Sequence, residues 1–373
     1  MLILRFLSVV GLVAGGACYF TGTQLAAAFP PWSAGAWGAW AWAATLWAFP
    51  LVRMIFFRGK GDPRVQSLGF MLLGTAATLF MGLLALKLSG WLLSLGGYAW
   101  PLWAPWAMLA GSGLLMLWGN ATAQGEATLK HIKIPTASLH PGLHGLRIVQ
   151  ISDLHVSHSL GAEQVQRLVD QVQALKPDLI AITGDLVDGP LKDLRGSVAP
   201  LAQLSAPLGV HYVTGNHEYF WGVQGWLQEL GSLGFEMLTN QHRSLDHQGA
   251  KLLVLGVNDY AADRLGDGQG PDLAQAMADA PRSDFTLFLA HQPQAYVMAE
   301  TAKADLFLAG HTHGGQFFPF QYLVGFFHRY YRGLYRHSDS LWVYIHSGSG
   351  YWGPPTRLGV PPEIALLELV LQS

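Results

Sequence analysis

The chain has 373 residues and a net charge of −2, and only 12% of its residues are charged while 51% are hydrophobic. Soluble domains carry about 25% charged residues. The near-neutral charge gives no reason to expect nucleic-acid binding, and the single cysteine, Cys18, excludes an intrachain disulfide and a cysteine-rich zinc site. Residues 1–120 hold seven charged side chains and residues 121–373 hold 39. The composition of residues 1–120 therefore suits a lipid environment, and that of residues 121–373 suits an aqueous one.

Four nearly charge-free stretches in the first third predict transmembrane helices. They are Leu2–Phe20, Ala34–Phe57, Ser67–Leu88 and Tyr98–Trp118. Each is close to the roughly 20 apolar residues that cross a hydrocarbon core about 30 Å thick. Helices buried in the core of a soluble protein are the alternative. The first stretch also resembles a cleaved signal peptide, because Arg5 precedes an apolar run, but three further stretches follow it and favour a retained anchor.

The positions of the cations predict the orientation of these helices. Cations gather between the second and third stretches and after the fourth; they are Arg53, Arg58, Lys60, Arg64, Lys130 and Lys133. The loops at 21–33 and 89–97 carry no charge. Because positive loops stay in the cytoplasm, we expect a multi-pass protein of the inner (cell) membrane whose C-terminal domain is cytoplasmic.

From residue 145 onward, short apolar runs alternate with helical patterns. The runs are Leu146–Ile151, Leu179–Thr183, Val210–Thr214, Leu252–Val257, Phe285–Ala290, Leu306–Ala309 and Leu341–His346. Runs of this length predict buried strands, and amphipathic stretches such as Ala162–Leu175 between them predict an α/β sandwich. The expected organisation is a four-helix membrane region at 1–120, a linker at 121–144 and the sandwich domain at 145–373.

Polar clusters follow five of these predicted strands. They are Asp153-Leu154-His155, Gly184-Asp185-Leu186-Val187-Asp188, Gly215-Asn216-His217-Glu218, His291 and Gly310-His311-Thr312-His313. Each cluster alone is weak evidence for a functional site, since short Asp and His patterns occur by chance. Open α/β sheets place their chemistry at strand ends, and carboxylates with imidazoles suit Mn, Fe, Zn or Co. All five clusters in this order, each at a strand end, would rarely arise by accident, and the set therefore predicts one shared functional site.

This ordered set resembles the calcineurin-like metallophosphoesterase superfamily over residues 145–373, and its bacterial membrane-associated branch in particular. The matching segments are Ile151-Ser152-Asp153-Leu154-His155, Gly310-His311-Thr312-His313-Gly314-Gly315-Gln316 with Pro319, Ser347-Gly348-Ser349-Gly350 and Pro361-Pro362-Glu363. The resemblance implies two central mixed β-sheets flanked by helices. It also implies a metal-dependent enzyme that hydrolyses a phosphoric ester or a pyrophosphate.

The resemblance implies a site with two divalent cations, for which Mn is preferred and Fe, Zn or Co are alternatives. It assigns Asp153, His155 and His313 to the first cation, and Asn216, His291 and His311 to the second, with Asp185 bridging the two. Two cations about 3.5–4 Å apart can clamp a phosphoryl group.

By the same resemblance, His217 stabilises the transition state or protonates the leaving oxygen, and Asp188 orients its ring. The alternatives are that His217 is a further ligand or a spacer, and that Asp188 caps a turn.

The segment 317–336 holds nine aromatic residues together with Arg329, Arg332 and Arg336, and follows directly on the His-x-His motif. We expect it to border the site. Aromatic rings with arginines suit a lipid phosphate, whereas a folded aromatic lid with ordinary surface arginines is the alternative.

The leading hypothesis is a membrane-anchored hydrolase acting on a phosphodiester or pyrophosphate bond of a lipid or lipid precursor, such as a phospholipid or a UDP-diacylglucosamine-type compound. Its partners are then the bilayer and a lipid-linked phosphate ester. The alternatives are a general phosphatase or nucleotide phosphodiesterase tethered to the membrane, and a non-catalytic membrane sensor or scaffold.

Overall fold

The computed structural model describes residues 2–56, 63–265, 269–318 and 320–372. The chain folds into two compact units. One comprises Met1–Ala121 with Gly353–Thr356, and the other comprises Thr122–Trp352 with Arg357–Ser373. Phe57, Arg58, Lys60 and Pro319, which the sequence predictions use, lie outside the described residues.

The first unit is built from four helices. They are α1 (Leu2–Ala26), α2 (Ala34–Phe56), α3 (Pro63–Ser94) and α4 (Ala104–Gln124), whose last turn belongs to the second unit. All four predicted apolar stretches are thus largely helical. Within the described part of the chain, one stretch, Leu68–Ser94 in α3, is long and apolar enough to cross a membrane, whereas the sequence pattern predicts four.

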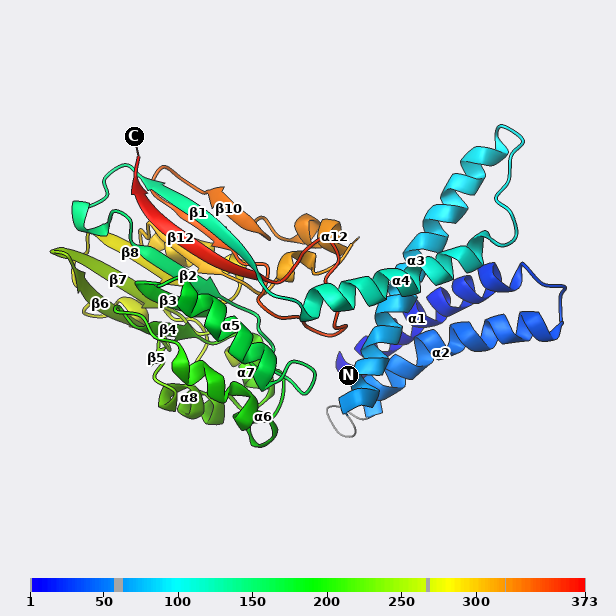
Figure 1. Cartoon of the computed structure of the whole chain (residues 1–373), viewed down its shortest axis with the longest axis horizontal. Helices are drawn as coiled ribbons and strands as arrows, with labels where there is room; N and C mark the ends of the chain where they lie inside the picture. Colours follow the sequence, from blue (N-terminus) through cyan, green and yellow to red (C-terminus); the bar gives the residue numbers. More distant parts are fainter. Residues whose placement is uncertain (1, 57–62, 266–268, 319, 373) are drawn as a thin grey trace. The chain divides into compact units, whose positions relative to one another are not determined.

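The second unit contains two six-stranded mixed β-sheets (Figure 1). In spatial order the first sheet consists of β1 (Thr128–Thr136), β12 (Glu363–Leu371), β2 (Arg147–Ile151), β3 (Leu179–Thr183), β4 (Val210–Val213) and β5 (Glu236–Met237). The second sheet consists of β10 (Gly333–Arg336), β11 (Trp342–Ile345), β9 (Leu306–Ala309), β8 (Phe285–Leu289), β7 (Ala250–Gly256) and β6 (Gln241–His247). The prediction of two mixed sheets is confirmed.

Helices flank the two sheets. They are α5 (Ala162–Ala174), α6 (Leu191–Val198), α7 (Asn216–Phe220), α8 (Val223–Ser232), α9 (Ala261–Leu265), α10 (Leu273–Met277), α11 (Tyr296–Thr301) and α12 (Phe320–Phe327). Short 3₁₀ turns complete the unit: η1 (Pro141–Leu143), η2 (Ala199–Gln203), η3 (Pro293–Ala295) and η4 (His313–Gly315). In α5 the residues Val165, Leu168, Val169 and Val172 are buried. Their spacing of three and four residues places them on one face of the helix.

The pairing of the strands determines where the polar clusters lie. β2, β3 and β4 run parallel to one another in the first sheet, and β7, β8, β9 and β11 do so in the second. The carboxyl ends of parallel neighbours lie at the same edge of a sheet, where the loops that follow them come together. β1 forms inside the stretch expected to be a linker, because its backbone pairs along its whole length with β12.

Candidate metal centre

The predicted ligands stand on loops that follow five strands. β2 precedes Asp153 and His155, β3 precedes Asp185, β4 precedes Asn216, β8 precedes His291, and β9 precedes His311 and His313. Five of these seven residues have left-handed backbones: Asp153 (φ 52°), His155 (φ 51°), Asp185 (φ 49°), His311 (φ 72°) and His313 (φ 51°). Such backbones cost about 1–3 kcal/mol each and concentrate at functional sites. The chain is therefore turned sharply at these strand ends, which aims the side chains inward.

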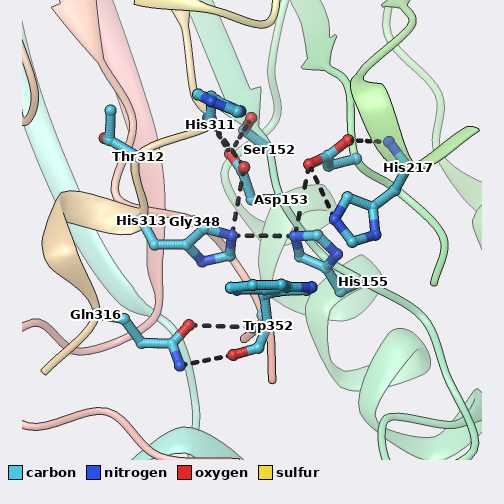
Figure 2. A network of polar contacts seen from close by, with 12 residues as sticks. Ser152, Asp153, His155, His217, His311, Thr312, His313, Gln316, Gly348 and Trp352 are labelled. Carbon is cyan, nitrogen blue, oxygen red and sulfur yellow. Dashed lines mark hydrogen bonds and ion pairs between the residues drawn. The ribbon is translucent and has the colours of Figure 1, made fainter. Parts of the chain in front are cut away.

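The first group of donors consists of Asp153, His155 and His313 (Figure 2). His155 Nε2 lies 3.0 Å from His313 Nε2, which lies 3.5 Å from Asp153 Oδ1. The Asp153 carboxylate is held by the Ser152 hydroxyl and by the backbone N–H of His311 at 2.9 Å. A divalent cation fits here, because it would satisfy imidazole nitrogens that otherwise face each other.

The second group gathers around His291. Its Nε2 lies 3.1 Å from Asp185 Oδ2, 3.1 Å from His311 Nδ1 and 3.2 Å from Asn216 Oδ1. Asp185, His291 and His311 satisfy the geometry of a metal-binding group. Asp185 Oδ2 is also 3.8 Å from His155 Nε2 in the first group. The Asp185 carboxylate therefore lies between the two groups.

Burial keeps several of these imidazoles neutral. Loss of water contact lowers the pKa of His155 and of His311 to about 3 each, and the neighbouring His217 and His291, respectively, add to the effect. Neutral imidazole is the form that binds a metal. Burial works in the opposite direction on a carboxyl and raises the pKa of Asp153 to about 7. Burial also opposes ionisation of Asp185, but His291 and His217 hold its pKa well below the usual value.

His217 and Asp188 form a pair beside the donors. His217 Nδ1 lies 3.0 Å from Asp188 Oδ1, and the same oxygen accepts a hydrogen bond of 2.9 Å from the indole N–H of Trp221. Burial opposes protonation of His217, but Asp185 and Asp188 raise its pKa to about 9. His217 Nε2 points toward Asp185 Oδ2 at 4.0 Å. A protonated ring at this place can donate a proton toward the donor cluster.

Glu218 and Arg357 are site residues for which the sequence pattern predicts no role. Glu218 is fully buried, and its carboxylate accepts hydrogen bonds from the backbone N–H groups of Gly215, Asp185 and Leu186 at 2.7, 3.1 and 2.8 Å. It therefore ties the loop after β3 to the loop after β4. The Gly-Asn-His-Glu motif, in which Glu218 directly follows His217, is the sequence signal from which this role could have been predicted.

Arg357 is also fully buried and supports His313. Its Nη1 donates to the carbonyl oxygens of Ser347 and His313 at 2.7 and 3.2 Å, and its Nη2 lies 3.1 Å from His313 Nδ1. The sequence around Arg357 carries no signal of this role, because the partners are 7 to 44 positions away.

Comparison with known proteins places this site in a family. The profile of the family "Calcineurin-like phosphoesterase" matches residues 146–315. Similar proteins include a transmembrane protein with metallophosphoesterase domain from Danio rerio, 35% identical over 263 residues, which cover 69% of this chain and 60% of that protein. An uncharacterised metallophosphoesterase from Helicobacter pylori is 39% identical over 226 residues, 60% of each chain. One from Aquifex aeolicus is 31% identical over 238 residues, which cover 63% of this chain and 89% of that protein.

The chain belongs to the calcineurin-like metallophosphoesterase family, a class of metal-dependent phosphoesterases, and the predicted resemblance is confirmed. Its relatives include animal as well as bacterial proteins. The chain spans about 60% of the length of the first of these relatives.

Proposed function

We propose that this chain is a membrane-anchored hydrolase that cleaves a phosphodiester or pyrophosphate bond with the help of two divalent cations. The observation that carries the proposal is the convergence of the donor atoms, which lie 3.0–3.8 Å apart although they come from five separate loops. When bound, two divalent cations supply Lewis-acid stabilisation of the phosphoryl charge.

The donor groups suggest how the cations are shared. We assign Asp153, His155 and His313 to one cation and Asn216, His291 and His311 to the other, with Asp185 between them. Oxygen and imidazole donors without thiolate accept Mn, Fe, Zn or Co, and Mn is our proposal.

His217 then acts as the general acid. Its Nδ1–H donates to Asp188, which fixes the ring and leaves Nε2 directed at the cluster. From there Nε2 can hand a proton to the leaving oxygen of the substrate. Asp188 positions the ring and stabilises its positive charge.

The helical unit is proposed to anchor the enzyme in a bilayer. The support is the apolar stretch in α3, the exposed aromatic and aliphatic side chains Trp91, Leu114 and Trp118, and the transmembrane naming of the Danio rerio relative. Apolar side chains that face outward along a helix are characteristic of membrane spans. We retain the proposal of four spans in residues 1–120, a linker at 121–144, and a cytoplasmic catalytic domain at 145–373 on the inner membrane.

A lipid or lipid precursor is the proposed substrate, because an active site held at a bilayer meets substrates that reside there. The aromatic and arginine-rich segment 317–336 supports this choice. The second candidate is a general phosphatase or nucleotide phosphodiesterase merely tethered to the membrane. A non-catalytic sensor is less favoured, since it would have no use for a complete donor set.

The test is hydrolysis by the full chain in detergent with added Mn. Bis-p-nitrophenyl phosphate should be cleaved, and Asp185→Asn should abolish cleavage while Asp193→Asn, a change on the surface helix α6, should not. A panel of phospholipids, UDP-linked lipids and nucleotides then separates the candidates. Cleavage of nucleotides without any lipid would favour the tethered phosphatase, and no cleavage of any phosphoester would contradict the proposal.

A further inference from the structure

The helix α12 and the residue Phe318 just before it expose large apolar side chains. Phe326 is 89% and Phe327 is 82% exposed, and Phe318, Tyr322 and Leu323 are more than half exposed. We refer to these five residues as the α12 apolar patch. Soluble surfaces rarely gather so many large apolar side chains in one place unless the place is an interaction surface.

The segment that carries this patch begins and ends beside the loop that holds His311 and His313. At its start, the backbone of Gln321 packs so closely on Gly315 that a Cβ on this glycine would overlap Gln321 Cα. At its end, the ring of His328 lies 6.5 Å from the ring of His311, and the Thr312 hydroxyl donates to the carbonyl of Tyr331 at 2.6 Å. The expectation that residues 317–336 border the site agrees with these contacts.

Exposed cations follow the patch. Arg329, Arg332 and Arg336 are all exposed, and Arg336 is paired with Asp339 at 3.4 Å, which leaves Arg329 and Arg332 as the cations nearest the patch in the chain. The Arg329 guanidinium stacks over the rings of Tyr296 and Tyr330, at 5.5 and 5.3 Å from their centroids. Stacking keeps this cation at a fixed place beside the apolar residues. Apolar rings next to arginines match a surface with an acyl interior and anionic headgroups.

We propose that the α12 apolar patch docks on an anionic lipid bilayer, with Phe326 and Phe327 among the acyl chains and Arg329 and Arg332 at the level of the phosphates. This docking proposal deepens the proposed function. It rests on that function in one respect, namely that the enzyme is present at a bilayer. A second copy of the chain is a poorer occupant, because a two-fold contact through the patch would bring the same arginines toward each other. Docking brings lipid headgroups to a segment whose two ends contact the loop that holds His311 and His313.

The test places a fluorescent label on the patch of the full-length protein in lipid vesicles. Cys18→Ser removes the native thiol, and Phe326→Cys introduces the labelling site. Asp246→Cys on β6, where the native side chain is 80% exposed, is the aqueous control, and Leu88→Cys in α3, where the native residue is 59% exposed, reports on anchoring. Vesicles contain phosphatidylcholine and phosphatidylglycerol, with doxyl-labelled lipid as the membrane quencher and iodide as the aqueous one.

We expect doxyl lipid to remove most of the fluorescence at position 326 and iodide to leave it unaffected, whereas position 246 should respond only to iodide. Replacing phosphatidylglycerol with phosphatidylcholine, or combining Arg329→Ala with Arg332→Ala, should weaken the doxyl effect at position 326. A label at position 326 that responds to iodide as position 246 does would overturn the proposal. So would shielding from both quenchers, which would mean that another protein covers the patch.

The failures of the two proposals are distinguishable, since quenching does not depend on hydrolysis. Lipid quenching at position 88 together with iodide quenching at position 326 contradicts docking and leaves anchoring intact. Lipid quenching at position 326 in a protein that cleaves no phosphoester supports docking and contradicts the proposed hydrolase.

Discussion

The side-chain amide of Gln316 pairs with both backbone groups of Trp352: its Nε2 donates to the carbonyl at 2.8 Å and its Oε1 accepts from the N–H at 3.0 Å (Figure 2). This pairing holds an indole that is 54% exposed, with its ring 6.1 Å from that of His217. Phe220 is equally exposed, and its ring lies 5.2 Å from His217. Two aromatic rings therefore stand beside the proposed general acid, where a leaving group would pass.

Gln316→Leu removes both hydrogen bonds at similar volume. We expect the KM for bis-p-nitrophenyl phosphate to rise about fivefold, the equivalent of about 1 kcal/mol for a lost hydrogen-bonded arrangement, with a smaller change in kcat. Gln228→Leu, on the exposed face of α8, is the matched control. Unchanged KM in Gln316→Leu would show that the position of Trp352 does not matter to substrate binding.

His217→Asn should retain metal and lose turnover by about 10²–10⁴-fold, the usual contribution of a positioned general acid. Asp188→Asn should lose less turnover, because the His217 ring remains but its orientation and its positive charge are less well supported. Steady-state kcat and the metal content by plasma mass spectrometry are measured together. Loss of metal in His217→Asn would show that His217 is a metal ligand instead of the general acid.

Removal of metal should abolish hydrolysis and lower the melting temperature. Chelation by EDTA withdraws cations that bind the folded state, and a ligand present at 100 times its Kd stabilises that state by about 2.7 kcal/mol. Addition of Mn should restore both properties. Full activity after exhaustive chelation would rule out a metal-dependent reaction.

Glu218→Gln should destabilise the catalytic domain by about 2–3 kcal/mol, because an amide replaces one oxygen that accepts from buried N–H groups and leaves donors unsatisfied. Thermal unfolding in detergent measures the effect. Glu163→Gln, whose native side chain is 85% exposed, should change stability by less than about 0.5 kcal/mol. Equal melting temperatures for the two variants would remove the assigned role of Glu218.

Asp305 should make stability depend on pH. Burial raises the pKa of its carboxyl to about 6, although the backbone N–H of Thr286 donates to it at 2.7 Å. A folded-state pKa above the unfolded value near 3.9 means that stability from this group is present at low pH and is lost as the pH rises through about 6. Asp305→Asn removes this loss, so the variant should gain stability relative to the native protein between about pH 4 and pH 7. If the melting temperatures of Asp305→Asn and the native protein differed by the same amount over this pH range, the raised pKa of Asp305 would be contradicted.

The sequence alone determined seven of the twelve described strands and the positions of the polar clusters that follow five of them, because both depend on local pattern. A run such as Leu179–Thr183 is apolar on both faces and is buried on both faces in the sheet. The donors follow such runs directly, and the parallel pairing of β2 with β3 then brings Asp153 and Asp185 to one edge of the sheet.

Only the tertiary structure decided which distant residues support the site. Arg357 reaches His313 across 44 positions, and β1 forms because it pairs with β12, more than 200 positions away. The exposure of Phe326 likewise depends on how the rest of the chain packs around α12, which no local pattern reports. Secondary-structure propensity and hydrophobic periodicity act over a few residues, whereas these contacts depend on how the folded chain packs. The sequence pattern therefore did not predict them.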